Sequence, residues 1–444
     1  IIGCKKKDER GSSMKHLLSS LALALLALGA HAETVLIENV RIFNGVDAEL
    51  RRGHVLVVDG LIETVSNEPV AAPADARVIE GNNRILTPGF IDLHVHLTLQ
   101  MPSERMREHG TAAGARSVAM AKFYLDHGFT TIRDAGGTHP DLAQAFNSGE
   151  LYGPRVFPSG AVVSQTAGHG DARMPHEPNP LLNHADPYQM GDGWILADGV
   201  DAHLTAVREN LKNGATQIKI MGGGGVMSDY DPIHSLQPSP AEIRAAVQAA
   251  GDWGTYVLAH AYTAEAITRL VENGVMSIEH GLLIDDDAAK LVSKKGAVIS
   301  TQLYIFRNLL QTEYMTDFQK EKARQVRAGQ ENLIRLLRKY DITTGFSTDF
   351  IFGEYAALPH EFTERAEFWS NAEVLHQATA EGGEIVRMAG KLNRHGNFGE
   401  IREGWVADLL LHNGEVLEDL SVLADPDSNL ALIMKNGEII KAQD

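Results

Sequence analysis

The sequence predicts an α/β fold, namely a (β/α)8 TIM barrel with a small β-sandwich domain built from both chain ends. Three observations predict it: β-rich segments at each end, a regular alternation of strand-like and helix-like segments between them, and reactive side chains at the ends of several expected strands. The expected boundaries are 33–86 and 398–444 for the two parts of the β-sandwich and 87–397 for the barrel.

The first 32 residues are expected to be absent from the mature protein. Residues 1–13 read as upstream or tag residues before Met14, and residues 14–32 combine a basic start, an apolar run and the cleavage signal "AHA". The apolar run is shorter than the roughly 20 residues that span a bilayer, which makes a membrane anchor the weaker alternative. We therefore expect a periplasmic or secreted protein that begins near Glu33 and makes no membrane contact after signal cleavage.

The β-sandwich is predicted from the residue composition of both chain ends. From Thr34 onward, "TVLIENVRIF", "GHVLVVDGLIETV" and "ARVIEG" carry β-branched residues separated by Gly, Asn and Asp. Near the C-terminus, "ADLLLHNG" and "ALIMKNGEIIKA" also look like strands, and the second contains an Asn-Gly turn signal. Two β-rich ends around an α/β middle indicate one small domain assembled from both.

The barrel is predicted from the alternating segments between these ends. The helix-like stretches end at or near Gly or Asp, as helices commonly do. A doubly wound open sheet is the alternative, but no G-x-G-x-x-G motif follows any expected strand. The expected strands are "GFIDLHVHL" (89–97), "FTTIRDAG" (129–136), "RVFPSGAVVS" (155–164), "QIKIMG" (217–222), "YVLAHAY" (256–262), "MSIEHG" (276–281), "AVISTQLY" (297–304) and "TTGFSTD" (343–349).

Two connections are longer than plain barrel loops. Residues 164–216 include "SQTAGHGDARMPHEPNP", and residues 305–342 are helical in pattern. Long structured insertions in a compact fold often serve as lids or binding loops, and an oligomer contact is the alternative.

The net charge limits the possible binding partners, and the cysteine count limits the possible metal ligands. The formal net charge of −18 argues against nucleic acid and anionic membrane surfaces as partners. The single cysteine, Cys4, excludes internal disulfides and cysteine-rich metal sites. Any metal ion must therefore be held by His, Asp, Glu or Lys.

Six side chains of metal-binding type fall within or at the ends of five expected strands. The carboxyl ends of barrel strands converge at one face, so these side chains are expected to meet. Individually each has a plain structural explanation, such as a buried histidine or a turn cap, but a lysine inside an apolar strand must shift its pKa or find a partner. The six residues are His94, His96, Lys219, His260, His280 and Asp349.

These motifs resemble the amidohydrolase superfamily. "LTPGFIDLHVHL" resembles the approach to its first barrel strand, and "GEIREGWVADLLL" its return to the β-domain. "GFTTIRDAGG", "QIKIMGGGGVMSDYDP" and "IEHG" are similar to the branch of Xaa-Pro and other acyl-amino-acid carboxypeptidases, related to imidazolonepropionase. That branch includes enzymes that hydrolyse the phenylalanine amide of ochratoxin.

The resemblance implies a binuclear site with two divalent metal ions, Zn²⁺ being favoured. It implies that His94, His96 and Asp349 hold the more buried ion, that His260 and His280 hold the more exposed one, and that a carboxylated Lys219 bridges both. A metal-bridging hydroxide would attack the amide, with Asp349 as general base and acid. The branch also implies a homo-oligomer.

Four further residues are candidates for substrate contacts. His169 in "TAGHGD" and Tyr230 in "GGGGVMSDYDP" lie in loops that should border the metals, where the branch uses a histidine and a tyrosine to bind the substrate carbonyl or its free carboxylate. We also assign His169 a catalytic role. Arg133 is a candidate partner of that carboxylate, or else part of a structural Arg–Asp pair, and Tyr262 is a candidate lining residue.

The predicted function is therefore hydrolysis of small amides that carry a free carboxylate, such as acyl-amino acids, Xaa-Pro dipeptides or ochratoxin A-type phenylalanine amides. A lactonase or phosphotriesterase is an alternative because it uses a similar site. An exported solute-binding protein that grips its ligand through a metal is a second alternative.

Overall fold

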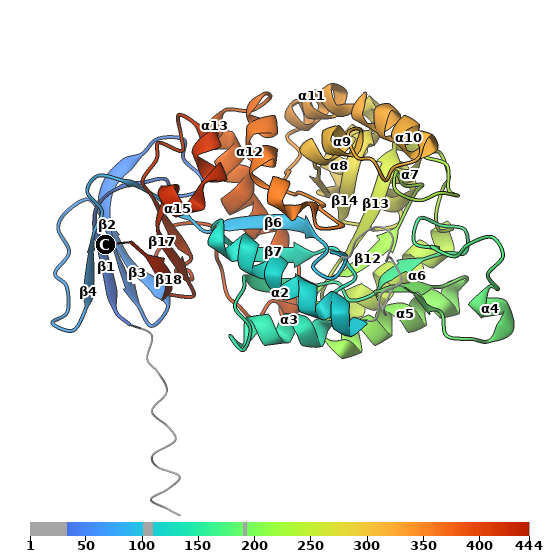
Figure 1. The fold of residues 1–444 in the computed structure, drawn as a ribbon, viewed down its shortest axis with the longest axis horizontal. Helices are drawn as coiled ribbons and strands as arrows, with labels where there is room; N and C mark the ends of the chain where they lie inside the picture. Colours follow the sequence, from blue (N-terminus) through green and yellow to red (C-terminus); the bar gives the residue numbers. More distant parts are fainter. Residues whose placement is uncertain (1–32, 101–109, 190–192, 444) are drawn as a thin grey trace, which may run out of the picture.

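The structure is a computed structural model that describes residues 33–100, 110–189 and 193–443 (Figure 1). The predicted signal peptide and the residues upstream of it lie outside this range. Within the described ranges, no helix combines the length and apolar character needed to cross a bilayer.

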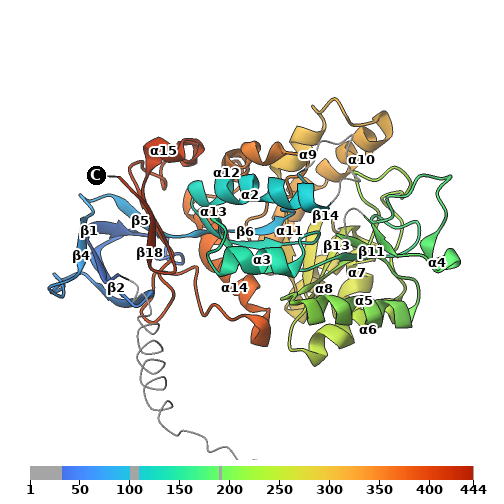
Figure 2. The ribbon, with the colours of Figure 1, turned by 60° about the horizontal axis from the view of Figure 1, so that its bottom comes forward.

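Strands from both chain ends pair in one sheet at one end of the molecule (Figures 1 and 2). The strand β5 joins the two ends, because it pairs in parallel with β1 and antiparallel with β16. The sheet has the order β18-β17-β16-β5-β1-β2-β3, with β4 paired to β1. Its strands are β1 (Val35–Ile42), β2 (Arg51–Val58), β3 (Leu61–Ser66), β4 (Arg77–Glu80), β5 (Ile85–Pro88), β16 (Leu409–His412), β17 (Leu430–Lys435) and β18 (Glu438–Ala442).

This terminal sheet has its own apolar core. Val35, Val57 and Ile62 from the N-terminal strands pack in one cluster with Leu432 and Met434 from the C-terminal strands, and all are fully buried or nearly so. The shared core explains why both ends are β-rich: neither set of strands could bury its apolar face alone.

The middle of the chain forms two sheets of parallel strands. One contains β6 (Phe90–Val95), β7 (Phe129–Asp134) and β8 (Arg155–Pro158). The other has the order β10-β11-β9-β12-β13-β14-β15 and is parallel except for the pair β10–β11. Its strands are β9 (Val162–Ser164), β10 (Tyr188–Gln189), β11 (Trp194–Leu196), β12 (Ile218–Met221), β13 (Val257–Thr263), β14 (Ser277–Leu283) and β15 (Val298–Ser300).

Residues 343–349 connect these two sheets, although they were expected to be a regular strand and are irregular. The Ile299 N–H donates to the Thr343 carbonyl on one side, at 3.1 Å, and the Leu93 N–H donates to the Phe346 carbonyl on the other, at 2.9 Å. The Phe346 N–H is diverted to the carbonyl of Gln377, which interrupts a strand ladder. The segment thus occupies the predicted place between β15 and β6 without a continuous ladder.

Helices follow most of the parallel strands and surround the two sheets (Figure 2). The strand-to-helix turns are fixed by side-chain caps: Thr263 caps the helix after β13, and Asp285 caps the helix after β14. The α-helices are α2 (Gly110–Asp126), α3 (Pro140–Asn147), α4 (Pro180–Asn183), α5 (Val200–Asn213), α6 (Pro240–Asp252), α7 (Ala264–Glu272), α8 (Asp286–Lys295), α9 (Tyr304–Leu309), α10 (Asp317–Arg327), α11 (Gln330–Tyr340), α12 (Pro359–Ala366), α13 (Asn371–His376), α14 (Gly382–Arg387) and α15 (Pro426–Asn429). Short helical turns are η2 (Glu354–Ala357), η3 (Gln377–Glu381), η4 (Gly390–Leu392) and η5 (Leu420–Ala424).

A buried ion pair ties the terminal sheet to β8. The Arg155 guanidinium donates to Asp408, at 2.6 Å and 3.2 Å, and to the Thr131 hydroxyl at 2.6 Å. Both charged side chains are almost completely buried. Breaking such a pair lowers the stability of the fold, because it leaves a buried charge without a partner.

We predict that Asp408→Ala lowers the free energy of unfolding by about 3–5 kcal/mol, because it strands the Arg155 charge in the interior. Urea denaturation followed by circular dichroism measures this change. The control is Asp47→Ala, which removes the exposed partner of Arg51 and should leave the unfolding midpoint unchanged. Equal midpoints for both variants would contradict the role given to this pair.

Candidate active site

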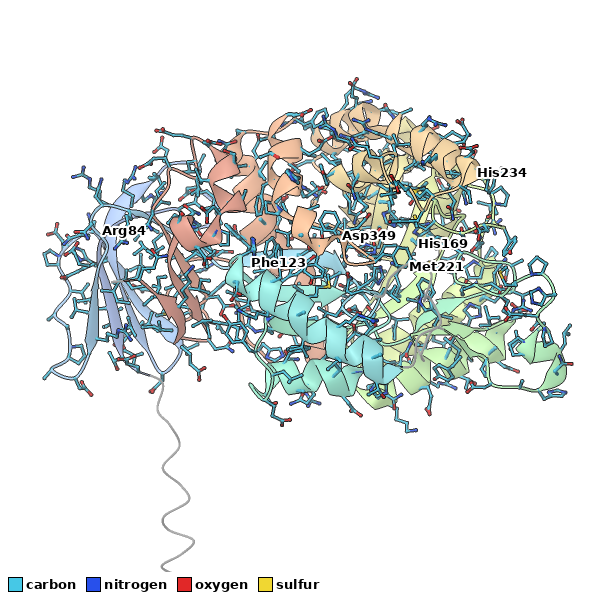
Figure 3. The ribbon with its side chains drawn as sticks, viewed as in Figure 1. Arg84, Phe123, His169, Met221, His234 and Asp349 are labelled. Atoms are coloured by element: carbon cyan, nitrogen blue, oxygen red, sulfur yellow. The ribbon has the colours of Figure 1, made fainter. Side chains whose placement is uncertain are left out.

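The six predicted metal-binding side chains come together at one cavity. The cavity has a volume of about 1070 Å³, and its lining includes all six residues together with the predicted His169, Tyr230 and Tyr262. Figure 3 shows His169 and Asp349 near Met221, at the ends of the parallel strands. Arg133 does not line this cavity.

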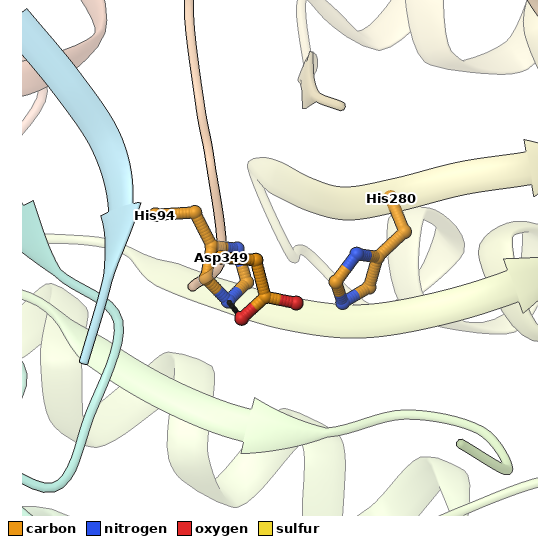
Figure 4. Close-up of side chains that lie close together, drawn as sticks. All are labelled: His94, His280 and Asp349. Carbon is orange, nitrogen blue, oxygen red and sulfur yellow. Dashed lines mark ion pairs between the residues drawn. The ribbon is translucent and has the colours of Figure 1, made fainter. Parts of the chain in front are cut away.

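His94, His280 and Asp349 form a cluster that could hold a metal ion (Figure 4). One nitrogen or oxygen atom of each lies within 4.8 Å of the others, although the residues come from β6, from β14 and from the end of segment 343–349. Asp349 Oδ1 lies 3.5 Å from His94 Nε2 and 3.3 Å from His96 Nε2. Ligand atoms of His94, His96 and Asp349 therefore converge on one point.

Hydrogen bonds on the far side of each ring orient these histidines. His94 Nδ1 donates to the Glu279 carboxylate at 2.8 Å, and His96 Nδ1 donates to the Gly136 carbonyl at 2.7 Å. His280 Nδ1 lies 2.6 Å from the Gln302 side-chain oxygen. With Nδ1 engaged in each case, Nε2 is left to bind a metal ion, the arrangement typical of metal-binding histidines.

His260 and Lys219 complete the set. The His260 ring lies 4.5 Å from the His280 ring between centroids, and its Nε2 lies 3.2 Å from the Gly224 carbonyl. Lys219 is buried in β12, with its Nζ 3.4 Å from His94 Nε2. A lysine thus sits among imidazoles inside the protein, as its place in an apolar strand predicted.

The electrostatics of the cluster suit a cation. Burial lowers the pKa of His94 and His260 well below the usual range and lowers that of His280 to about 4, so all three are neutral near pH 7. Burial raises the pKa of Asp349, but interactions with His94, His96 and His280, including a hydrogen bond from His96, outweigh it and hold this pKa below its usual range. Burial also lowers the pKa of Lys219 to about 8. Neutral imidazoles around an ionised carboxylate are the protonation states that metal binding requires.

Two of these residues have a strained backbone. His280 and Asp349 have φ angles of 75° and 57°, in the left-handed region that non-glycine residues rarely adopt. Such conformations persist where the surrounding structure fixes them, and they cluster at functional sites. In Asp349 the N–H donates to the His94 carbonyl at 2.8 Å, which fixes the turn beside β6.

The placement of Arg133 argues against its predicted contact with substrate. Its side chain is completely buried behind the histidines, and its Nη2 donates to both oxygens of Glu279, at 2.7 Å and 2.9 Å. Its remaining donors bind the Leu93 carbonyl and the Tyr256 and Ser277 hydroxyls. The alternative of a structural pair is the better description, with Glu279 as the partner instead of an aspartate.

Glu279 is the residue that sequence reasoning missed. It precedes His280 in the quoted motif "IEHG", and its side chain is fully buried. A carboxylate inside an apolar strand is the same kind of signal as the lysine at position 219.

The loop after β12 is held by the second insertion. Lys322 of α10 points its Nζ at the carbonyls of Gly225, Ser228 and Asp231, at 2.5 Å, 2.6 Å and 3.3 Å. Gln319 of the same helix donates to the Met227 carbonyl at 2.7 Å. The loop that carries Tyr230 is therefore tied to α10.

His169 and the two tyrosines lie at different depths. The His169 ring stacks on the His260 ring at 4.4 Å, and its Nδ1 lies 2.9 Å from the Ser228 hydroxyl. Tyr262 is buried, and its ring lies 5.0 Å from that of His280. Tyr230 is 49% exposed at the rim, where its hydroxyl contacts the Met174 sulfur at 3.7 Å.

Both long insertions contribute to the cavity, as expected of binding loops. The first supplies His169, Met174 and Trp194, and the second supplies residues of α9 and α10. The loop backbone in the run Gly222–Gly225 approaches the His169 ring closely. A Cβ at Gly225 would lie 1.8 Å from this ring. Glycine is required there because the loop backbone packs directly on this imidazole.

The chain is similar to known enzymes in sequence and in fold. Ochratoxinase of Aspergillus niger is 28% identical over 407 residues, covering 88% of this chain and 83% of that enzyme. The crystal structure of a prolidase complexed with N-methylphosphonate-L-proline has a TM-score of 0.85 at 35% identity, covering 92% of this chain and 100% of the other. The crystal structure of A. niger ochratoxinase has a TM-score of 0.82 at 26% identity, covering 93% and 96%.

These likenesses extend over nearly the whole described chain, and they place its α/β fold with the TIM-barrel type of these enzymes. The sequence profile of the amidohydrolase family matches residues 85–441, which confirms the resemblance seen in the motifs. The protein therefore belongs to the amidohydrolase family and is a hydrolase that acts on amide bonds.

Proposed function

We propose that the protein is a binuclear-metal amidohydrolase of carboxypeptidase type, which hydrolyses acyl-amino acids or dipeptides that carry a free carboxylate. The observation that carries this proposal is the convergence of four histidines, a lysine and an aspartate on one cavity. Its relatives support the substrate class: one is named ochratoxinase, and another is a prolidase complexed with a phosphonate derivative of proline.

The donor set fits two divalent ions, with zinc favoured. His94, His96 and Asp349 would hold one ion, His260 and His280 would hold the other, and a carboxylated Lys219 would bridge them. Carboxylation would replace a buried amine beside His94 with an anion, which suits a position between two cations. When bound, the ions would supply an activated water molecule and polarise the substrate carbonyl.

The residues of the chain would perform the remaining tasks. Asp349, ionised at neutral pH, accepts a proton from the attacking water and returns it to the leaving nitrogen. When the Ser228 hydroxyl donates to Nδ1 of His169, the Nε2–H of this ring is left to donate to the substrate carbonyl. Tyr230 at the rim binds the free carboxylate, and Tyr262 forms the wall beside His260 and His280.

The finer architecture is part of the same proposal. The two parallel sheets and segment 343–349 would constitute the (β/α)8 barrel within 87–397, and 33–86 with 398–444 the β-sandwich domain. We also propose that the mature protein is exported and assembles as a homo-oligomer.

The direct test is release of a free amino acid by the metal-loaded protein. Dialysed, zinc-restored protein is incubated with N-acyl-amino acids, Xaa-Pro dipeptides and ochratoxin A, and in parallel with lactones and phosphotriesters. We expect hydrolysis in the first group. Turnover of only the second group would favour a lactonase or phosphotriesterase, and binding without turnover would favour a solute-binding protein.

We predict that Asp349→Asn lowers kcat by about 10²–10⁴-fold, because asparagine cannot accept the proton. Asparagine tolerates the left-handed backbone of this position, so the fold should persist. Elemental analysis should show that most of the metal remains. The control is Asp341→Asn, an exposed helix cap with φ of 49°, which should retain activity. Comparable kcat values for the wild type and Asp349→Asn would remove Asp349 from this role.

We predict that Tyr230→Phe raises KM for substrates with a free carboxylate at least tenfold more than for the corresponding methyl esters. The reason is that the hydroxyl is the group that would donate to the carboxylate. Steady-state kinetics with paired acids and esters measure the difference. Tyr152→Phe is the matched control, because Tyr152 is exposed and its hydroxyl binds Asp126 outside the cavity. An equal change of KM for acids and esters would refute the assignment.

A further inference from the structure

The cavity is larger and more apolar than a small dipeptide requires. Its volume of about 1070 Å³ slightly exceeds the ~300–1,000 Å³ typical of pockets that enclose drug-sized ligands. Met174, Met221 and Met227 line it, together with Phe306 and Leu309 of α9. Methionine side chains adapt to irregular apolar ligands, so this lining suits a bulky apolar group.

Two aromatic side chains of this lining, from different segments of the chain, meet edge to face. Tyr314 comes from the connection between α9 and α10, and Phe352 follows Asp349 by three residues. Their ring centroids lie 5.6 Å apart with an interplanar angle of 89°. Tyr314 is 36% exposed and Phe352 is partly exposed, so the pair is not buried in the core.

Phe352 is held in an unfavourable backbone conformation. Its φ angle is 54°, in the left-handed region where a bulky side chain is a genuine outlier. The turn is fixed because the Phe352 N–H donates to the Leu99 carbonyl at 2.8 Å and the Gly353 N–H donates to the Gln100 side chain at 3.0 Å. Gln100 in turn donates to the His96 carbonyl at 2.7 Å. Glycine or asparagine would fit this backbone better, so an aromatic ring here works against local preference.

Tyr314 is positioned from the same segment. Its hydroxyl donates to Glu354 Oε1 at 3.0 Å, and Glu354 begins the turn η2 just after Phe352. One stretch of chain therefore carries Asp349, presents Phe352 and orients Tyr314. Three residues span at most about 11 Å, which places Phe352 within one substrate length of Asp349.

We propose that Tyr314 and Phe352 form an aromatic subsite that selects substrates with a flat aromatic group on one side of the scissile amide. Aromatic rings in offset or edge-to-face contact attract each other beyond the area that they bury. This inference rests on the proposed function and names the substrate class within it.

The test compares substrates that differ only in the aromatic group. N-(2-naphthoyl)-L-alanine places the ring on the acyl side, N-acetyl-L-phenylalanine places it on the amine side, and N-acetyl-L-alanine has none. For the zinc-restored wild type we expect kcat/KM at least tenfold higher for one aromatic substrate than for N-acetyl-L-alanine, and that substrate identifies the side. In Phe352→Gly and in Tyr314→Leu this ratio should fall at least tenfold, chiefly through KM.

A binding measurement separates this inference from the proposed function. Calorimetric titration with 2-naphthoate needs no turnover, and Kd should rise at least tenfold in both variants. Phe352→Leu serves as a second variant that keeps apolar volume, and Trp253→Leu, an exposed aromatic outside the cavity, is the control that should keep the wild-type Kd. Unchanged Kd and unchanged substrate ratio in the subsite variants would overturn the subsite. Loss of naphthoate binding in these variants without hydrolysis of any amide by the wild type would support the subsite and refute the proposed function.

Discussion

The buried contact between Arg133, Glu279 and His94 is the interaction on which the rest of the site depends. It links β7, β14 and β6, and all three side chains are almost completely excluded from water. Two opposite charges this deep are costly to desolvate, and they persist because the guanidinium and the carboxylate satisfy each other's hydrogen bonds. The Glu279 carboxylate also dictates the His94 tautomer, so the direction of His94 Nε2 follows from an ion pair placed beneath it.

Around this contact, the site combines rigid strands with loops that other elements hold. The histidines of β6, β13 and β14 are fixed by the sheets, whereas the loop of Tyr230 is fixed by Lys322 from α10. Rigid strand positions suit metal binding, because ligand geometry must be reproducible. The loops and insertions shape the larger, apolar part of the cavity. The chemistry and the choice of substrate thus reside in different parts of the fold.

The sequence was most informative where histidine or lysine stands inside an apolar strand. Histidines and a lysine inside apolar strands predicted the convergence that the structure shows, since parallel strands end at one edge. For Arg133 the sequence left a substrate contact and a local Arg–Asp pair open, and it could not name the actual partner, because Glu279 lies in a distant strand. Phe352 and Tyr314 gave no periodic signal, because their positions depend on backbone angles and on contacts between loops. Segment 343–349 had the composition of a strand, but tertiary hydrogen bonds diverted its backbone.

The terminal sheet has a consequence for how the protein is made. Its β5 must pair with β16, more than 300 residues later in the chain (His412 opposite Ile85). During synthesis, the N-terminal strands therefore have an open edge and an incomplete apolar core until β16, β17 and β18 have been synthesised. Termination of synthesis before β16 would leave the edge of β5 uncovered and prone to self-association.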